Sequence, residues 1–335
     1  MNGENQTKFV LENNEEKIQE VQKNLPKSPF MGSELVQLAK YQNIWYGDMY
    51  IQNILKLQRN FVAQDTDLII GSLMKTGTTW LKALLFAIVN RAHHPVAQSP
   101  LLSHHPHELV HSLEPLYGEH PSHNPNDIPS PRLFSTHLSY TSLPESMKNS
   151  KCRILYICRN PLDMLVSLYF FSINFMKKQV EDFKPPSMEE FFEDFYVGRH
   201  PCGPFFKHVV EYWKASLERP EKVLFLKYED LKDDPTFHLK RLAKFIGVPF
   251  SPHEESEGVI TQIIELCSIK TMKGLEVNKS DNKAIDKFFD KKTYFRKGEV
   301  GDWINHFTPT MVERMKKLME EKLEGTGLSF TLLPQ

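Results

Sequence analysis

Short apolar runs, each followed by a polar turn, are the most regular feature of this sequence. Four of them have the length and composition of buried β-strands, and they span Asp67–Ser72, Arg132–Thr136, Arg153–Cys158 and Lys222–Leu226. Three of these runs lead into helical patterns, at Thr78–Arg91, Pro161–Phe175 and Pro235–Ile246. Because strand and helix alternate, the sequence predicts an α/β fold with a central parallel sheet flanked by helices. Ligands are then expected at the carboxyl ends of the strands.

The chain reads as one domain preceded by an arm. Residues 1–30 are rich in Glu, Asn, Gln and Lys, and they bury too little apolar surface to offset the entropy of ordering. We therefore expect a mobile N-terminal arm over 1–30 and a single domain over 31–335. The Pro- and His-rich stretch His93–Arg132 is predicted to be a long irregular excursion within that domain.

Composition narrows the class of protein. The 335 residues are 40% hydrophobic and 25% charged, which is ordinary for a globular chain. The formal net charge is −1, so no global field attracts nucleic acid or an anionic membrane. No apolar run approaches the roughly 18 residues of a membrane helix, and the acidic N-terminus lacks a secretory signal. With four cysteines in no CxxC spacing, the sequence indicates a reduced, cytoplasmic protein.

An anion-binding loop is predicted where the first strand meets the first helix, at Gly71–Trp80. Helix N-termini present unpaired N–H groups and a partial positive charge. Lys75 adds a full charge, Gly77 permits close approach of the backbone, and Thr78 and Thr79 add hydroxyl donors. The order differs from that of the nucleotide-binding P-loop, because Lys75 precedes the glycine.

Two further strand ends carry residues suited to chemistry. His137 follows the strand Arg132–Thr136, and histidine is the natural base near neutral pH. From its position alone, a structural role for His137 stays open. Arg159 follows the strand Arg153–Cys158, and its guanidinium offers a fork of donors for phosphate, although a surface ion pair is the alternative.

Several separate motifs, in order between Asp67 and Phe330, resemble those of cytosolic sulfotransferases, especially of the plant type. They are Lys75-Thr76-Gly77-Thr78-Thr79-Trp80, Ser135-Thr136-His137-Leu138, Cys158-Arg159-Asn160-Pro161 with Ser167, and Phe295-Arg296-Lys297-Gly298 followed by Gly301-Asp302-Trp303. The resemblance implies a phosphosulfate-binding strand-loop-helix that is like a P-loop. It also implies transfer of a sulfuryl group from 3′-phosphoadenosine 5′-phosphosulfate (PAPS) to a hydroxyl of a small organic acceptor.

The resemblance also implies a role for each matched residue. His137 would be the catalytic base, and Lys75 would contact the bridging oxygen and stabilise the leaving phosphate. The remaining donor-binding residues would be Thr76, Gly77, Thr78 and Thr79 at the 5′-phosphate, Arg159, Ser167, Arg296, Lys297 and Gly298 at the 3′-phosphate, and Trp80, Tyr228, Cys267, Ser268 and Met272 around adenine. Two residues depart from the family pattern: Met74 replaces a proline, and Ile269 replaces an aromatic residue that would stack on the base.

Three other functions are compatible with parts of the sequence. His107-Glu108-Leu109-Val110-His111 matches the zinc hydrolase pattern, but Pro106 and Pro115 leave barely two helical turns. A nucleotide kinase would need Mg²⁺ held by carboxylates at strand ends, and here those ends carry Arg159 and Lys227-Tyr228. A binding protein with a decayed site is disfavoured because Lys75 and His137 are both present. We therefore predict no metal.

The acceptor stays open among the classes that the resemblance suggests: flavonoids, steroids, hormones and similar hydroxylated molecules. Its walls are expected from Trp45–Tyr50, His93–Ser112, Phe170–Phe183 and Asp281–Lys292. Animal relatives dimerise through a Lys…Thr-Val…Glu motif after Gly-Asp-Trp. Here Thr308 and Glu313 match it, but Ile304 and Pro309 replace the Lys and Val, so we expect a monomer or weak homodimer.

Overall fold

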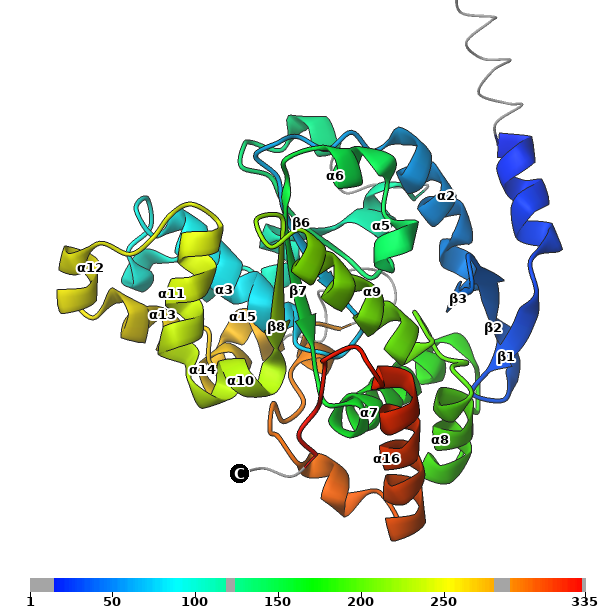
Figure 1. Cartoon of the computed structure of the whole chain (residues 1–335). Coiled ribbons are helices and arrows are strands. Elements are labelled where there is room, and N and C mark those ends of the chain that lie inside the picture. Colours follow the sequence, from blue (N-terminus) through cyan, green and yellow to red (C-terminus); the bar gives the residue numbers. More distant parts are fainter. Residues whose placement is uncertain (1–14, 119–123, 280–289, 333–335) are drawn as a thin grey trace, which may run out of the picture.

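The computed structural model describes residues 15–118, 124–279 and 290–332. Its centre is a five-stranded sheet with the order β5-β6-β4-β7-β8 and parallel pairing throughout (Figure 1). The strands are β4 (Leu68–Ser72), β5 (His111–Ser112), β6 (Leu133–Thr136), β7 (Arg153–Cys158) and β8 (Val223–Lys227). This confirms the predicted α/β fold and, within a residue, all four predicted strands. The two-residue edge strand β5 was not predicted, because it lies in the irregular Pro- and His-rich excursion.

Helices cover both faces of this sheet. The longer ones are α2 (Ile51–Asn60), α3 (Thr78–Asn90), α7 (Pro161–Gln179), α8 (Met188–Tyr196), α9 (Phe205–Glu218), α11 (Pro235–Phe245), α13 (Val259–Leu266) and α16 (Pro309–Leu323). The shorter ones are α4 (Pro106–Leu109), α5 (Leu113–Leu116), α6 (Glu145–Asn149), α10 (Tyr228–Asp233), α12 (Pro252–Ser256), α14 (Ile269–Gly274) and α15 (Glu276–Lys279). Within the described ranges, none of them is both long and apolar enough to cross a membrane.

Alternation along the strands creates two separate apolar cores. Successive residues of a strand point to opposite faces of the sheet. Ile154 and Tyr156 of β7 accordingly join the core under α7, α9 and α16, while Leu155 and Ile157 join the core under α3, α11 and α13. Both faces of the sheet are therefore buried, as the continuous apolar runs indicated.

A second, antiparallel sheet precedes the central one and includes residues from the segment predicted to be an arm. Residues 15–24 are helical, and β1 (Lys27–Phe30) pairs with β2 (Ser33–Tyr41), which pairs with β3 (Ile44–Gly47). Residues 27–30 are therefore part of a sheet, and the domain boundary itself stays a prediction. Strand β1 is an edge strand that pairs with β2 along one side, and Phe30 packs edge-on against Phe191. Residues 1–14 lie outside the described ranges.

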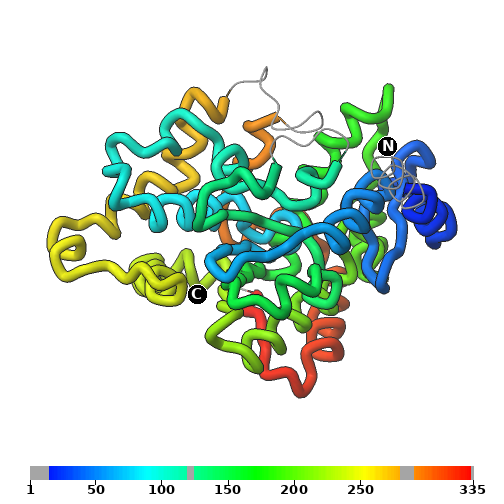
Figure 2. The backbone as a smooth tube through the Cα atoms, turned by 90° about the horizontal axis from the view of Figure 1, so that it is seen from above, coloured from blue at the N-terminus to red at the C-terminus, as the bar shows by residue number. Residues whose placement is uncertain are grey.

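The small sheet and the helices α11–α13 lie at opposite ends of the molecule, as the blue and yellow segments of Figures 1 and 2 show. The carboxyl ends of β4, β6, β7 and β8 lie between them. These strand ends carry the loop before α3, His137, Arg159 and Tyr228, so the topology gathers segments far apart in sequence at one edge of the sheet.

Candidate active site

The loop between β4 and α3 is shaped to bring its backbone close to a ligand. Gly77 has a φ of 114°, and an added Cβ would lie 2.8 Å from the Tyr228 ring, so only glycine fits there. The single proton of the Thr76 hydroxyl is shared between the carbonyl oxygens of Leu73 and Ile157, which lie 2.8 and 2.9 Å from Oγ1. Thr76 therefore ties the loop to β7, and only its backbone can serve a ligand.

Lys75 is a destabilised cation in this loop. Its Nζ lies 4.2 Å from the centre of the Phe171 ring and 5.8 Å from that of Tyr294. Burial lowers the pKa of Lys75 to about 7, and the charges of Arg296 and Arg159 act in the same direction. Three cations converging on one cavity indicate a polyanionic ligand.

The orientation of His137 leaves one ring nitrogen for chemistry. Its Nδ1 lies 2.8 Å from the Ser72 carbonyl oxygen, which can only accept, so Nδ1 carries the proton in the neutral ring. The backbone N–H of His137 donates to the Glu114 carboxylate at 2.7 Å. Burial lowers the pKa of His137, with Glu114 and the Ser72 carbonyl opposing the shift. The neutral form of His137 is therefore favoured, and the lone pair of its Nε2 is not used by the contact with Ser72.

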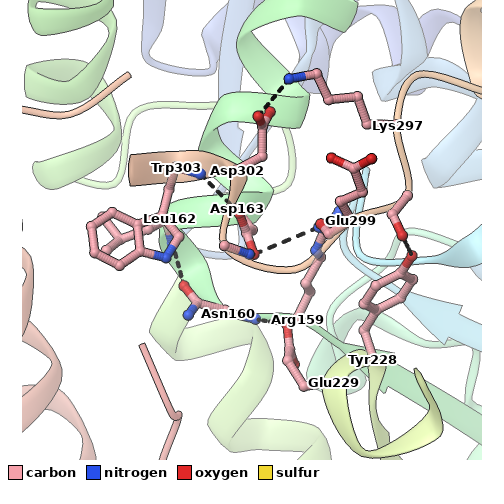
Figure 3. A network of polar contacts seen from close by, with 12 residues as sticks. Arg159, Asn160, Leu162, Asp163, Tyr228, Glu229, Lys297, Glu299, Asp302 and Trp303 are labelled. Carbon is pink, nitrogen blue, oxygen red and sulfur yellow. Dashed lines mark hydrogen bonds and ion pairs between the residues drawn. The ribbon is translucent and has the colours of Figure 1, made fainter. Parts of the chain in front are cut away.

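Arg159 and the loop after η6 (Lys291–Tyr294) form a second cationic region, drawn in Figure 3. Asp163 of α7 accepts hydrogen bonds from the backbone N–H groups of Gly301 and Trp303, at 2.7 and 3.1 Å. Arg159 donates to the carbonyl oxygen of Glu299 and lies 3.6 Å from Asp163. The loop is thereby held against the N-terminus of α7, as the predicted closing loop requires.

Arg296 and Lys297 both pair with Asp302, at 2.6 Å each. The Nε atoms of Arg159 and Arg296 are nevertheless buried, and neither has a hydrogen-bond partner in the described part of the chain. Buried donors of this kind are costly unless a ligand accepts from them. The two arginines therefore fit a phosphate group.

Aromatic and apolar side chains border the other side of the donor region. Trp80 and Tyr228 pack edge to face with ring centres 5.2 Å apart, and the Tyr228 hydroxyl donates to the Gly298 carbonyl at 2.9 Å. The Arg159 guanidinium lies 4.5 Å from the Tyr228 ring centre. Ile269 packs against Gly298 so closely that an added Cβ would lie 2.5 Å from its side chain.

One cavity of about 930 Å³ joins these regions. Fourteen of the sixteen predicted site residues line it: Lys75, Gly77, Thr78, Thr79, Trp80, His137, Arg159, Ser167, Tyr228, Cys267, Ser268, Met272, Arg296 and Gly298. The other two predicted residues do not line the cavity. The Thr76 side chain points from the loop toward β7, and the Lys297 side chain is 45% exposed in its pair with Asp302. The structure therefore brings together residues predicted from six separate segments: 75–80, 137, 159–167, 228, 267–272 and 296–298.

The cavity continues into an apolar region beside the small sheet. Val36 and Leu38 of β2, Tyr46 of β3, and Phe171 and Phe175 of α7 line it. The Tyr46 and α7 contributions match the predicted acceptor walls, whereas that of β2 was not expected. Most of the predicted wall Asp281–Lys292 lies outside the described residues.

The positions of His107, Glu108 and His111 contradict the zinc hydrolase alternative. Helix α4 ends at Leu109, and His111 lies on β5, so the two histidines do not share a helical face. Both ring nitrogens of His107 are engaged, with Thr79 and Lys82, and Glu108 pairs with Lys291. Within 15–118, 124–279 and 290–332, no three His, Cys, Asp or Glu side chains are grouped to hold a metal.

The carboxylates near the strand ends are used by the backbone rather than arranged for Mg²⁺, which disfavours the kinase. Glu229 accepts from the Asn160 N–H at 2.9 Å, and Asp163 accepts from two N–H groups of the closing loop. Kinase chemistry would need such carboxylates free for the metal.

Sequence reasoning missed two charged residues beneath the loop. Lys82 is fully buried on α3, and burial lowers its pKa to about 7 while Glu114 opposes the shift. Glu114 accepts from the Thr136 hydroxyl and the His137 N–H, both at 2.7 Å. A charge among the apolar positions of the predicted helix was the one available indication of Lys82.

Comparison with known proteins shows which family the chain resembles. The family described as "Sulfotransferase domain" matches residues 65–327. Cytosolic sulfotransferase 8 of Arabidopsis thaliana is 45% identical over 295 residues, which cover 87% of this chain and 87% of that protein.

Two solved structures have the same fold. One is an Arabidopsis thaliana protein assigned as a steroid sulphotransferase, with a TM-score of 0.72, 37% identity, and coverage of 93% of this chain and 94% of that one. The other is mouse sulfotransferase SULT7A1 complexed with PAP, with a TM-score of 0.65, 27% identity, and coverage of 87% and 96%.

Proposed function

The chain belongs to the sulfotransferase domain family, and from that premise we propose that it transfers a sulfuryl group from PAPS to a hydroxyl of a small organic acceptor. The observation that carries the proposal is the shared cavity, which is lined by His137, by the cationic side chains Lys75, Arg159 and Arg296, and by an apolar region. The mouse relative complexed with PAP supports the same donor, because PAP is the product that PAPS leaves after transfer.

His137 and Lys75 divide the chemistry in this proposal. Nε2 of His137 takes the proton of the acceptor hydroxyl, whose oxygen forms a bond to sulfur while the bond from sulfur to the phosphate oxygen breaks. Lys75 offsets the negative charge that grows on that phosphate oxygen. The products are a sulfate ester and PAP, and the proton on His137 is released to solvent. The charge on the leaving group is met by Lys75, so the step needs no metal.

The donor would lie along the edge of the sheet. The N-terminal amides of α3 with Thr78 and Thr79 would bind the 5′-phosphate, in the manner of helix N-termini. Arg159, Ser167, Arg296 and Gly298 would bind the 3′-phosphate, with Lys297 released from Asp302 to join them. Trp80 and Tyr228 would border adenine, with Cys267, Ser268 and Met272 on its far side.

The acceptor is proposed to be a mostly apolar hydroxylated molecule. Its region of the cavity is lined by β2, β3 and α7, and such apolar linings suit ring systems that carry few polar groups. Flavonoids and steroids fit this description. We further propose a single domain that includes β1, a cytosolic location like that named for the Arabidopsis relative, and a monomeric or weakly dimeric state.

The test is a transfer assay with sulfur-labelled PAPS and a panel of flavonols, steroids and simple phenols, with and without EDTA. We expect labelled product from at least one phenol or alcohol, unchanged by EDTA. Absence of transfer to every acceptor, together with no binding of PAP by calorimetry, would reject the proposal. Activity that is lost in EDTA and restored by zinc or magnesium would revive a metal mechanism.

A further inference from the structure

Lys82 is a buried lysine just beyond the phosphate loop, charged below about pH 7, and the proposed function does not use it. It lies on α3 with no exposed surface. Its ammonium lies 3.1 Å from His107 Nδ1 and 3.0 Å from both the Val110 carbonyl oxygen and the Ser112 hydroxyl. An ammonium group carries three N–H donors, so these three acceptors match its capacity. Such complete pairing is what a charged group needs in order to remain inside a protein.

His107 links this cation to the phosphate loop. Its Nε2 lies 3.0 Å from Thr79 Oγ1. Burial lowers the pKa of His107 well below its usual value, and the charge of Lys82 acts the same way, so the ring is neutral and carries one N–H. Because Nδ1 accepts from Lys82, that N–H is on Nε2 and donates to Thr79.

Thr79 is thereby left with a hydroxyl proton to donate. Its oxygen already accepts from His107, and elsewhere in the described part of the chain it has no other hydrogen-bond partner. Thr79 is the second residue of α3 and lines the cavity, where the N-terminal amides of the helix also point. The fixed acceptor contact turns a freely rotating hydroxyl into an oriented donor.

We propose that Lys82 and His107 are positioning residues for the 5′-phosphate of the donor, acting through Thr79. The order of hydrogen bonds runs from Lys82 Nζ to His107 Nδ1, from His107 Nε2 to Thr79 Oγ1, and from the Thr79 hydroxyl to a phosphate oxygen. This chain of hydrogen bonds involves no proton transfer. The inference rests on the proposed function, because it takes the loop before α3 as the 5′-phosphate site. It also gives a role to His107, one of the two histidines of the zincin-like motif that line the cavity.

The test compares two nucleotides by calorimetry: PAP and adenosine 3′-phosphate, which lacks the 5′-phosphate. His107→Phe keeps an aromatic ring against Tyr294, whose ring centre lies 4.3 Å away, but removes both nitrogens. Lys82→Met keeps the apolar stem and removes the ammonium. We expect each variant to bind PAP about tenfold more weakly, since a hydrogen bond to a charged group is weakened. Binding of adenosine 3′-phosphate should stay within about twofold of wild type.

A second background separates positioning from a general structural role. Thr79→Val removes the hydroxyl and should itself weaken PAP binding about tenfold. Adding His107→Phe to Thr79→Val should then cause no further loss, because the coupling passes through the hydroxyl. Thr79→Ser keeps the hydroxyl and should keep the full response to His107→Phe.

The inference would be overturned if His107→Phe weakened the binding of PAP and of adenosine 3′-phosphate equally. It would also be overturned if His107→Phe weakened PAP binding as much in the Thr79→Val background as in the wild-type protein. If Lys82→Met does not fold, as judged by thermal unfolding, the His107 and Thr79 variants decide alone. If the wild-type protein binds the two nucleotides equally, the 5′-phosphate site itself is wrong and the proposed function fails with the inference.

Discussion

The hydrogen bond at one ring nitrogen of His137 determines what the other nitrogen can do. The Ser72 carbonyl accepts from Nδ1, and the Glu114 carboxylate fixes the backbone of the same residue. The ring is held in one tautomer, with Nε2 as the basic atom. Lys75 lies in the same cavity but has no basic role while it is charged.

This difference predicts distinct effects for two substitutions. His137→Ala should lower turnover about 10²–10⁴-fold, the usual contribution of a positioned base. The loss should be larger with an aliphatic alcohol than with an acidic phenol, which is already partly ionised. Lys75→Ala should slow both acceptors alike and weaken PAP binding, because it meets charge on the leaving group. Steady-state rates with one phenol and one alcohol check this. Full activity of His137→Ala on the alcohol would make His137 structural.

Donor binding should also take up a proton at Lys75. In the free protein the pKa of Lys75 is lowered to about 7, so most of the side chain is neutral at pH 8. A bound polyanion favours the charged form and raises that pKa, so binding at pH 8 should absorb about one proton per site. Below pH 6 the lysine is already charged and the uptake should vanish.

Calorimetry of PAP binding in buffers with different ionisation enthalpies measures this uptake directly. Lys75→Met is the matched control, because it keeps the length of the side chain and cannot take up a proton. Uptake that persists unchanged in Lys75→Met would assign the proton to another group.

A site residue could be predicted from the sequence when its partners lie close to it along the chain. Lys75, Thr78 and Thr79 lie within ten consecutive residues, so the sequence alone was enough to recognise them as one anion-binding motif. The tautomer of His137 could not be predicted from the sequence, because its partner Ser72 precedes it by 65 positions. Lys82 was missed for the same reason, since its acceptors lie 25 to 30 residues away.

At the scale of elements, the start of α7 and the closing loop form one unit. Asp163 accepts from the N–H groups of Gly301 and Trp303 and so holds the closing loop against α7. Arg159 and Arg296 both line the cavity, and their Nε atoms have no hydrogen-bond partner among the described residues. A 3′-phosphate would accept from both arginines, each bond being worth about 1.5–3 kcal/mol. PAP should therefore bind at least about tenfold more tightly than adenosine 5′-phosphate, which lacks the 3′-phosphate.

Calorimetry with the two nucleotides measures this ratio, and Arg159→Met should reduce it while leaving the affinity for adenosine 5′-phosphate nearly unchanged. Equal affinities in the wild-type protein would remove the 3′-phosphate assignment from this unit.

Elements with local signals were predicted well, and those that depend on distant pairing were not. The buried strands β4, β6, β7 and β8 are continuous apolar runs that end at turns, so their bounds agreed with prediction within a residue. Strand β1 has an unremarkable, largely polar sequence. Its stability comes from pairing with β2, as in Lys27 with Ala39, which no local pattern in residues 27–30 reveals.

At the scale of the whole molecule, the surface after Gly301-Asp302-Trp303 bears on assembly. Ile304 is 54% exposed, and Thr308 caps α16, whose first residue is Pro309. The Thr308 hydroxyl accepts from the Met311 N–H at 3.3 Å, so the chain turns into a helix where the animal motif has Thr-Val. Proline also lacks the N–H that pairing across a two-fold axis would use.

We therefore expect a monomer at nanomolar concentration and at most a weak dimer at higher concentration, measured by sedimentation velocity. The double substitution Ile304→Lys and Pro309→Val restores the two missing members of the motif and returns a backbone donor, so it should shift the protein toward a dimer. Single substitution of Ile304 serves as the control, because it changes the exposed surface without freeing the backbone at 309. A wild-type dimer that persists at nanomolar concentration would contradict the expectation and would place the interface on another face of the molecule.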